Sequence, residues 1–313
     1  MEQTTPPKPK RKWPYVVFVL VLLWLLAIVF SSFASLFLGI EGDTLGGNVA
    51  LIPVKGVIMG DSASGFFSEG ASSEEIVRLI EKADENPSIK AIIIEINSPG
   101  GSPVASDEIT QALKRTNKTT VAWIREIGTS GGYWVASGSD HIVANRMSIT
   151  GSIGVIASYL DFSGFIERYN VSYERMVAGK YKDIGSPFRE LTSEERTLFQ
   201  NVLDDLRDEF IDEVAANREM PRKDVEKLAT GLFFLGKDAK EMGLVDELGG
   251  EQEVIAYIEE KEGITVHIVK YKPREGLLDV LGGAFAGQSF HIGQGIGDAI
   301  VEKGKASTVQ FST

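Results

Sequence analysis

The sequence contains no cysteine, so disulfide bonds, thiolate metal ligands and cysteine nucleophiles are all excluded. Histidine is almost as scarce. Only His141, His267 and His291 occur, and the absence of an HExxH pair argues against a histidine-rich metal centre. We therefore expect neither a metal ion nor an organic cofactor.

Basic residues are also outnumbered, because the formal net charge of the chain is −12. Four cations and one carboxylate give residues 1–13 a net charge of +3, which leaves −15 for the rest of the chain. Phosphate binding requires clustered lysine and arginine, so we do not expect nucleic acid as a partner. The apolar content of 43% is ordinary for a globular protein, so wholesale disorder is not expected.

A long stretch without charge runs from Trp13 to Ile40. A bilayer core needs about 20 such residues in a helix. Cations precede the stretch and acidic residues follow it, so the positive-inside rule places the N-terminus in the cytoplasm. We expect residues 1–13 to be cytoplasmic and residues 14–40 to form a single-pass anchor in the cytoplasmic (inner) membrane. The alternative is a cleaved signal peptide, whose apolar region usually covers only about 7–15 residues.

Strand and helix signals alternate after a glycine-bearing linker at residues 41–47. We expect strands at 49–54, 91–96, 120–124, 142–144 and 171–177, and helices after the capping boxes Ser72–Glu75 and Thr192–Glu195, near 104–115 and directly after Ser130. This alternation indicates an α/β fold with a largely parallel sheet. Pro53 indicates an edge or a bulge in the first strand. We place the folded domain at residues 48–273 and a glycine-rich, weakly ordered tail at residues 274–313.

Two loops follow apolar strands that the pattern predicts to be buried, at the strand ends where ligands bind in open α/β sheets. In Asn97–Gly101, paired glycines let the backbone approach a substrate and present N–H groups to an oxyanion, although a plain tight turn fits equally well. In Gly128–Tyr133, Ser130 stands at a strand-to-helix junction and is followed by two glycines. This is the setting of an exposed nucleophile, although its spacing is not that of the GxSxG elbow. A serine that merely caps a helix is the alternative reading.

A nucleophilic serine needs a base. His141 opens an apolar strand run, so a structural or surface role is expected for it. A lysine can replace histidine if its pKa falls from about 10.4 toward about 7–8, and burial in an apolar pocket can lower the pKa in this way. Lysines are abundant, so spacing alone does not select one.

Five motifs occur in a fixed order along the chain. They are Ser98-Pro99-Gly100-Gly101, Ser130-Gly131-Gly132-Tyr133, Thr150-Gly151-Ser152-Ile153-Gly154-Val155, Lys182-Asp183-Ile184-Gly185-Ser186-Pro187, and Ala239 followed by Gly243-Leu244-Val245-Asp246-Glu247-Leu248-Gly249. Together they resemble the short form of bacterial signal peptide peptidase A, peptidase family S49, over residues 48–260. The resemblance implies a Clp-protease/crotonase-like α/β fold, with a largely parallel sheet flanked by helices and preceded by one N-terminal transmembrane helix.

The resemblance also implies roles for individual residues. Ser130 matches the nucleophile of the family and Lys182 matches its general base. Ser152 matches a serine that orients the lysine, whereas Gly101 and Gly131 match the oxyanion donors. In the family, serine and lysine come from adjacent protomers of a dome-shaped ring, for which we expect an octamer.

The implied function is a membrane-anchored serine endopeptidase with a Ser-Lys dyad. It would degrade remnant signal peptides and other unfolded or membrane-near peptides on the extracytoplasmic (periplasmic) side. Three alternatives stay open at this point. They are a crotonase-fold enzyme that acts on acyl thioesters, a non-catalytic membrane scaffold, and a serine–histidine hydrolase that uses His141.

Overall fold

The computed structural model describes residues 13–38, 46–61 and 70–271, which fall into two compact units divided after Gly46. In the first unit, helix α1 (Trp13–Leu38) coincides with most of the uncharged stretch. No helix within the described residues qualifies as a membrane span. The predicted tail at 274–313 and most of the predicted linker at 41–47 lie outside the described residues.

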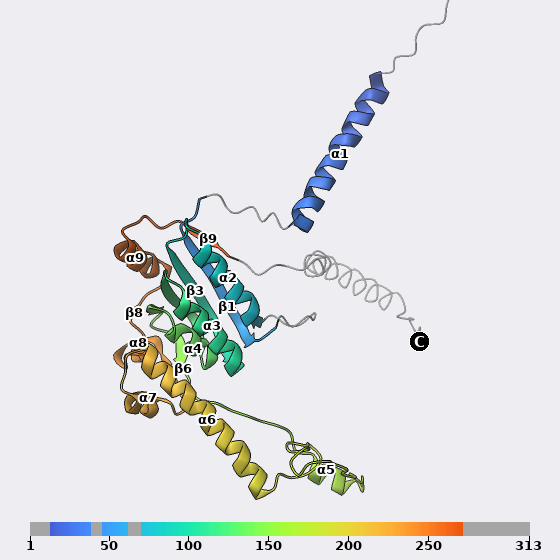
Figure 1. Ribbon diagram of the computed structural model, residues 1–313, viewed down its shortest axis with the longest axis vertical. Coiled ribbons are helices and arrows are strands. Elements are labelled where there is room, and N and C mark those ends of the chain that lie inside the picture. Colours follow the sequence, from blue (N-terminus) through green and yellow to red (C-terminus); the bar gives the residue numbers. More distant parts are fainter. Residues whose placement is uncertain (1–12, 39–45, 62–69, 272–313) are drawn as a thin grey trace, which may run out of the picture. The chain divides into compact units, whose positions relative to one another are not determined.

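The second unit is built on one sheet (Figure 1). Its strands are β1 (Val49–Met59), β2 (Gly70–Ser72), β3 (Ala91–Gly101), β4 (Thr119–Thr129), β5 (His141–Ala144), β6 (Ile149–Gly151), β7 (Phe233–Leu235), β8 (Glu247–Leu248) and β9 (Ile268–Lys270). The main order is β2-β1-β3-β4-β5-β8, with β9 beside β1, β6 beside β4 and β7 beside β6. All pairings within the described residues are parallel except β6–β7, which confirms the predicted largely parallel sheet.

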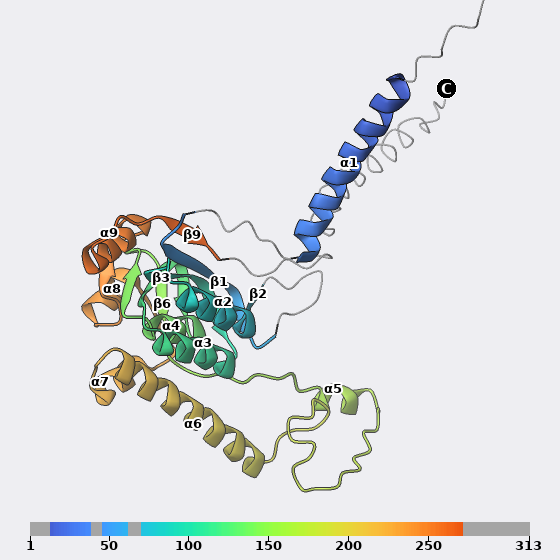
Figure 2. The ribbon, with the colours of Figure 1, turned by 45° about the horizontal axis from the view of Figure 1, so that its top comes forward.

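Helices cover both faces of this sheet (Figures 1 and 2). They are α2 (Ser73–Glu85), α3 (Pro103–Arg115), α4 (Gly131–Ser137), α5 (Ser163–Arg168), α6 (Ser193–Asn217), α7 (Arg222–Leu228), α8 (Gly236–Glu241) and α9 (Glu251–Glu262). The larger core lies between the sheet and α2, α3, α4 and the C-terminal part of α6. A smaller core lies on the opposite face under α9.

Strand β3 shows why the sheet is buried on both faces. Successive strand side chains point to opposite faces, so Ile92 and Ile94 enter the larger core whereas Ala91 and Ile93 enter the smaller one. Both sets are fully buried, which explains the continuous apolar run in the sequence.

Pro53 occupies a local edge inside a strand that is otherwise paired on both sides. On one side of β1, residues 49–51 pair with β9 and residues 57–59 pair with β2. Pro53 falls in the gap between these partners, while on its other side it lies opposite Glu95 of β3. The missing proline N–H therefore removes no ladder hydrogen bond at that gap, in agreement with the predicted edge position.

The structure corrects two strand predictions. The strand predicted at 171–177 is wrong, because this segment is irregular and pairs with no strand in the described chain. Its alternating apolar side chains have no sheet to pack on, and backbone groups of a strand require a partner. Strands β3 and β4 are both longer than predicted, since each continues through polar and glycine residues to the edge of the sheet.

We predict that Ile94→Ala lowers the free energy of unfolding by about 2–5 kcal/mol, because it removes buried methylene groups and leaves a cavity. Ile94 is 0% exposed. The matched control is Ile156→Ala, since Ile156 is 90% exposed and its truncation leaves no cavity. Urea denaturation measures both variants, and equal midpoints would contradict the assignment of Ile94 to the core.

Candidate active site

Ser130 stands at the turn between strand β4 and helix α4. Its φ of +52° and ψ of −125° lie in a region that favours glycine. A non-glycine residue in such a conformation costs on the order of 1–3 kcal/mol and persists only where its surroundings impose it. Here the Ser130 N–H donates to the Gly151 carbonyl at 2.8 Å. The turn therefore holds the serine at the carboxyl edge of the sheet, where ligands bind in α/β folds.

The two glycine loops are in direct backbone contact at this edge. A Cβ atom added to Gly100 would lie 2.6 Å from the Gly131 nitrogen and 2.9 Å from the Ser130 Cβ. A Cβ atom added to Gly131 would clash with Ser106 Oγ and would lie 3.2 Å from the Gly101 nitrogen. The backbone nitrogens of Gly101 and Gly131 thus lie near one another beside Ser130. This is the arrangement that two oxyanion donors require.

Four of the five predicted site residues line one cleft of about 650 Å³, and these are Gly101, Ser130, Gly131 and Ser152. Ser130 Oγ has no hydrogen-bond partner within the described residues. Ser152 shares the unusual φ of +52°, and its Oγ donates to the Gly231 carbonyl at 3.1 Å. The structure therefore brings the predicted nucleophile, the two predicted oxyanion donors and the second serine together.

Lys182 is the predicted site residue that does not line this cleft. It lies on an exposed arm, residues 155–190, which contains α5 and leads into the N-terminus of α6 (Figures 1 and 2). Its backbone N–H donates to the Gly179 carbonyl at 3.2 Å within a turn. Within one described chain, Ser152 therefore does not contact Lys182, and Ser130 and Lys182 do not form the predicted dyad.

An ion-pair network fixes the arm beside Lys182. The next residue, Asp183, accepts from Arg175 Nη2 at 2.6 Å and from Arg189 Nη2 at 3.1 Å. Arg189 also donates to both carboxylate oxygens of Glu195, at 2.6 and 2.8 Å, and Glu195 completes the predicted capping box of α6. Hydrogen bonds from Arg175 and then Arg189 lower the pKa of Asp183, and the bond from Arg189 lowers the pKa of Glu195 to about 2.

His141 lies at the opposite end of the sheet from Ser130. It begins β5 and stands opposite Val121 in the register of β4. Ser130 follows nine positions further along the chain, roughly 30 Å away at about 3.3 Å per strand residue. The His141 ring instead stacks on Tyr257 at 3.8 Å and contacts Glu247 at 3.3 Å. This position argues against the serine–histidine alternative.

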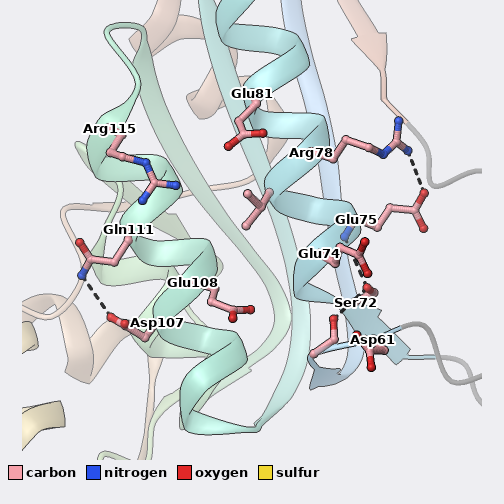
Figure 3. A pocket seen from close by; sticks show the side chains of 12 residues that line it. Asp61, Ser72, Glu74, Glu75, Arg78, Glu81, Asp107, Glu108, Gln111 and Arg115 are labelled. Carbon is pink, nitrogen blue, oxygen red and sulfur yellow. Dashed lines mark hydrogen bonds and ion pairs between the residues drawn. The ribbon is translucent and has the colours of Figure 1, made fainter.

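A larger hollow of about 930 Å³ contains none of the predicted site residues. It lies along helices α2 and α3 and is lined mainly by carboxylates and two arginines, Arg78 and Arg115 (Figure 3). Size alone therefore does not identify the site. The smaller cleft is the candidate because it joins a strained serine to two clustered backbone donors.

Comparison with known proteins now adds to this geometry. The model of peptidase family S49 matches residues 112–265, which include Ser130, Ser152 and Lys182. A relative from Enterococcus faecium, provisionally named signal peptide peptidase SppA, is 31% identical over 72% of this chain and 67% of that protein. The chain belongs to peptidase family S49. It is accordingly a serine peptidase of the SppA type.

Two further matches are a protein sequence and a solved structure. A provisionally named protease of Methanocaldococcus jannaschii is 29% identical over 92% of this chain and 94% of that protein. A solved structure of the 1510-N membrane-bound stomatin-specific protease, as a lysine-to-alanine mutant with a substrate peptide, is 17% identical. It covers 76% of this chain and 99% of that chain with a TM-score of 0.49, a likeness too weak to bear on the site.

Sequence reasoning missed the residues that reach the cleft from α6 and from the segment after α7. Arg207 and Phe210 line it from α6, and Ala229, Thr230 and Gly231 line it from that later segment. The apolar stripe of α6 indicated packing only, and the i, i+3 spacing of Arg207 and Phe210 was the one signal that both share a helix face.

We predict that Gly131→Ala lowers kcat by about 100-fold, because the clash with Ser106 Oγ displaces one oxyanion donor. Cleavage of a fluorogenic apolar peptide measures this loss. Adding Ser106→Ala to the same chain removes the clashing oxygen and should restore part of the activity. Full activity of the single variant would show that the Gly131 N–H does not contact the oxyanion.

We also predict that acid releases the arm around Lys182. Asp183 and Glu195 have folded-state pKa values below those of the unfolded chain, so their stabilising effect is present above about pH 4. It is lost as the pH falls through the folded values toward about 2. Pepsin digestion between these limits should cut first within residues 171–190. Asp183→Asn, tested with trypsin at pH 7, should make the same segment sensitive, and an equally resistant variant would contradict this role.

Proposed function

We propose that this serine peptidase is a membrane-anchored endopeptidase in which Lys182 of one copy activates Ser130 of another. This proposal depends on one observation, which is that Ser130 and Lys182 lie apart within one chain. Ser130 lies in a cleft with its oxyanion donors, but the described lining offers it no carboxylate, histidine or lysine as a base. Lys182 lies on the arm, outside that cleft.

The surface of the arm supports contact with a second copy. Large apolar side chains are exposed there, including Ile156, Leu160, Phe165, Tyr169, Val171, Met176, Phe188 and, on α6, Leu198 and Val202. Exposed apolar surface that gathers into a large patch marks protein–protein contacts. An arm that docks on the next copy forms a head-to-tail interface, which closes into a ring when the rotation allows it. We propose such a ring, with eight protomers as the expected size.

The proposed reaction begins when neutral Lys182 accepts the Ser130 hydroxyl proton as the oxygen attacks a peptide carbonyl. The N–H groups of Gly101 and Gly131 donate to the tetrahedral oxyanion. The Lys182 ammonium then protonates the leaving amine, and water hydrolyses the acyl-enzyme with the lysine again as base. Burial of a lysine against apolar side chains disfavours its charged form. A docked copy would bury Lys182 in this way. Ser152, already in the cleft, would orient the incoming amine.

The membrane placement is proposed from the sequence. The uncharged stretch at 14–40, preceded by cations, would anchor the chain in the cytoplasmic membrane with the peptidase domain on the extracytoplasmic side. Tethering raises the local concentration of membrane-near substrates. Remnant signal peptides and other unfolded chains are the proposed substrates, in keeping with the names of the SppA relatives from Enterococcus faecium and Arabidopsis thaliana.

Two alternatives fit the observations less well. An acyl-thioester enzyme would use the glycine donors but would not need Ser130 in a strained turn. A scaffold without activity would not need Ser130 and Lys182 together. Membership of a peptidase family and the presence of both residues therefore favour proteolysis.

We predict that Ser130→Ala and Lys182→Ala each abolish cleavage of a fluorogenic apolar peptide, whereas His141→Ala stays active. The full-length protein in detergent micelles is the sample for all four chains. Substantial activity of Lys182→Ala would overturn the proposed base. Loss of activity in His141→Ala with a native unfolding midpoint would favour the serine–histidine alternative.

Mixing the two inactive variants tests whether the site is shared. In a randomly mixed ring, half of the copies keep Ser130 and half of their neighbours keep Lys182, so about a quarter of wild-type activity should return. Dissociation and reassembly of the mixture must precede the assay. If Lys182 instead reaches Ser130 of its own chain, the mixture stays inactive.

A further inference from the structure

Arg207 is the only charged residue among those that the described structure places around the Ser130 cleft. It extends from α6, while the walls beside it are formed largely by apolar residues such as Phe210, Ala229 and Val155. Arginine stays protonated at every physiological pH, so this cleft carries a fixed positive charge. The chain as a whole carries a formal net charge of −12, whereas the described lining of this cleft holds one cation and no carboxylate.

The guanidinium is held in place, and its Nη atoms form an ion pair with Asp208 but no hydrogen bond within the described residues. Its Nε donates to the Ala229 carbonyl at 3.1 Å, which holds the side chain against the segment after α7. Its nearest carboxylate oxygen among the described residues belongs to Asp208, at 3.8 Å from Nη1, which is beyond hydrogen-bonding distance. The side chain is 34% exposed. Donors on both Nη atoms are therefore available to a ligand in the cleft.

A second donor in the same lining also has no acceptor. Trp134 is only 6% exposed, yet its buried Nε1 has no hydrogen-bond partner within the described residues. Its ring stacks on Phe210, with centroids 4.6 Å apart, and Phe210 lies one helical turn after Arg207. A buried unsatisfied donor costs free energy until a ligand or water supplies an acceptor. The Arg207 donors are the ones exposed toward the cleft, and they suit a ligand with acceptor oxygens.

We infer that Arg207 binds a carboxylate of the substrate peptide during cleavage at Ser130. Guanidinium and carboxylate form paired, charge-assisted hydrogen bonds, which are stronger when water is excluded by apolar walls. The carboxylate that every released peptide possesses is its C-terminal one, even when its side chains are all apolar. An acidic side chain is the other source of the same group. Arg207 would thus favour peptides with a free end close to the scissile bond.

This inference rests on the proposed proteolysis at Ser130. The experiment therefore compares the cleavage rates of matched peptides by the same enzyme, not the total activity of different variants. The full-length protein in detergent micelles is given one apolar peptide with a free C-terminal carboxylate and the same peptide as its amide. Wild type should cleave the free acid with a kcat/KM about ten-fold higher, as a charged hydrogen bond allows. Arg207→Gln should bring the ratio of acid to amide close to one, and Arg207→Lys should keep part of it.

A third peptide separates the two sources of carboxylate. It is amidated at its end and carries glutamate in place of the last apolar residue. If it is cleaved as slowly as the plain amide, the terminal carboxylate is the group recognised. If it matches the free acid, Arg207 still binds a carboxylate, but the preference for chain ends is wrong.

The ratio of free-acid to amide cleavage also distinguishes carboxylate binding by Arg207 from a purely structural role of Arg207. Loss of the Ala229 contact would lower cleavage of acid and amide alike and leave their ratio unchanged, and that result would overturn the inference. Arg78→Gln is the matched control, because Arg78 pairs with Glu75 on α2 outside the cleft and its loss should leave the ratio at the wild-type value. If Ser130→Ala keeps its activity, the assignment of Ser130 as the nucleophile is wrong. That result differs from a changed ratio of free-acid to amide cleavage, so the two failures can be told apart.

Discussion

The active-site edge depends on one steric constraint, the contact between two backbone turns that leaves no room for side chains. Gly100 at the end of β3 lies so close to Ser130 and Gly131 that a Cβ on Gly100 would lie 2.6 Å from the Gly131 nitrogen. A Cβ on Gly131 would clash with Ser106 Oγ of α3, and a Cβ on Gly101 would clash with the backbone of Ile58 in β1. This contact places two backbone nitrogens beside the serine. It also helps to hold Ser130 at a positive φ, a conformation that an isolated serine would leave.

Much of the fold could be predicted because local pattern and tertiary environment agree. The apolar run of β3 is buried on both faces, and the capping box at Thr192 and Glu195 forms as its sequence indicates. The sequence around Ser130 also favoured a candidate nucleophile over a simple helix cap, because a serine followed by two glycines fits a turn that faces a ligand. The assignment of Lys182 as the base came from the resemblance, not from any local signal.

Other features of the fold and the site could not be predicted from local sequence, because they depend on residues that are distant in the sequence. Residues 171–177 alternate like a strand, but no neighbouring strand exists in the described chain to receive their hydrogen bonds. Arg207 enters the cleft because α6 packs on α4 through Phe210 and Trp134, a contact that helical periodicity indicates only as burial. The acceptor environment of a side chain is likewise invisible in sequence, so the orphan Trp134 Nε1 was not foreseen.

The ion pairs of the arm bear on the proposal that the Ser-Lys dyad is shared between two copies. A general base must sit within about 3 Å of the hydroxyl that it deprotonates, so a loose lysine would be of little use. The bonds of Asp183 to Arg175 and Arg189, and of Arg189 to Glu195, tie the Lys182 turn to the start of a 25-residue helix. These bonds fix the backbone turn that carries Lys182 within one chain. In the proposed assembly, docking would place this preformed turn beside the Ser130 cleft of the next copy, so that peptides would meet a complete site only in the ring.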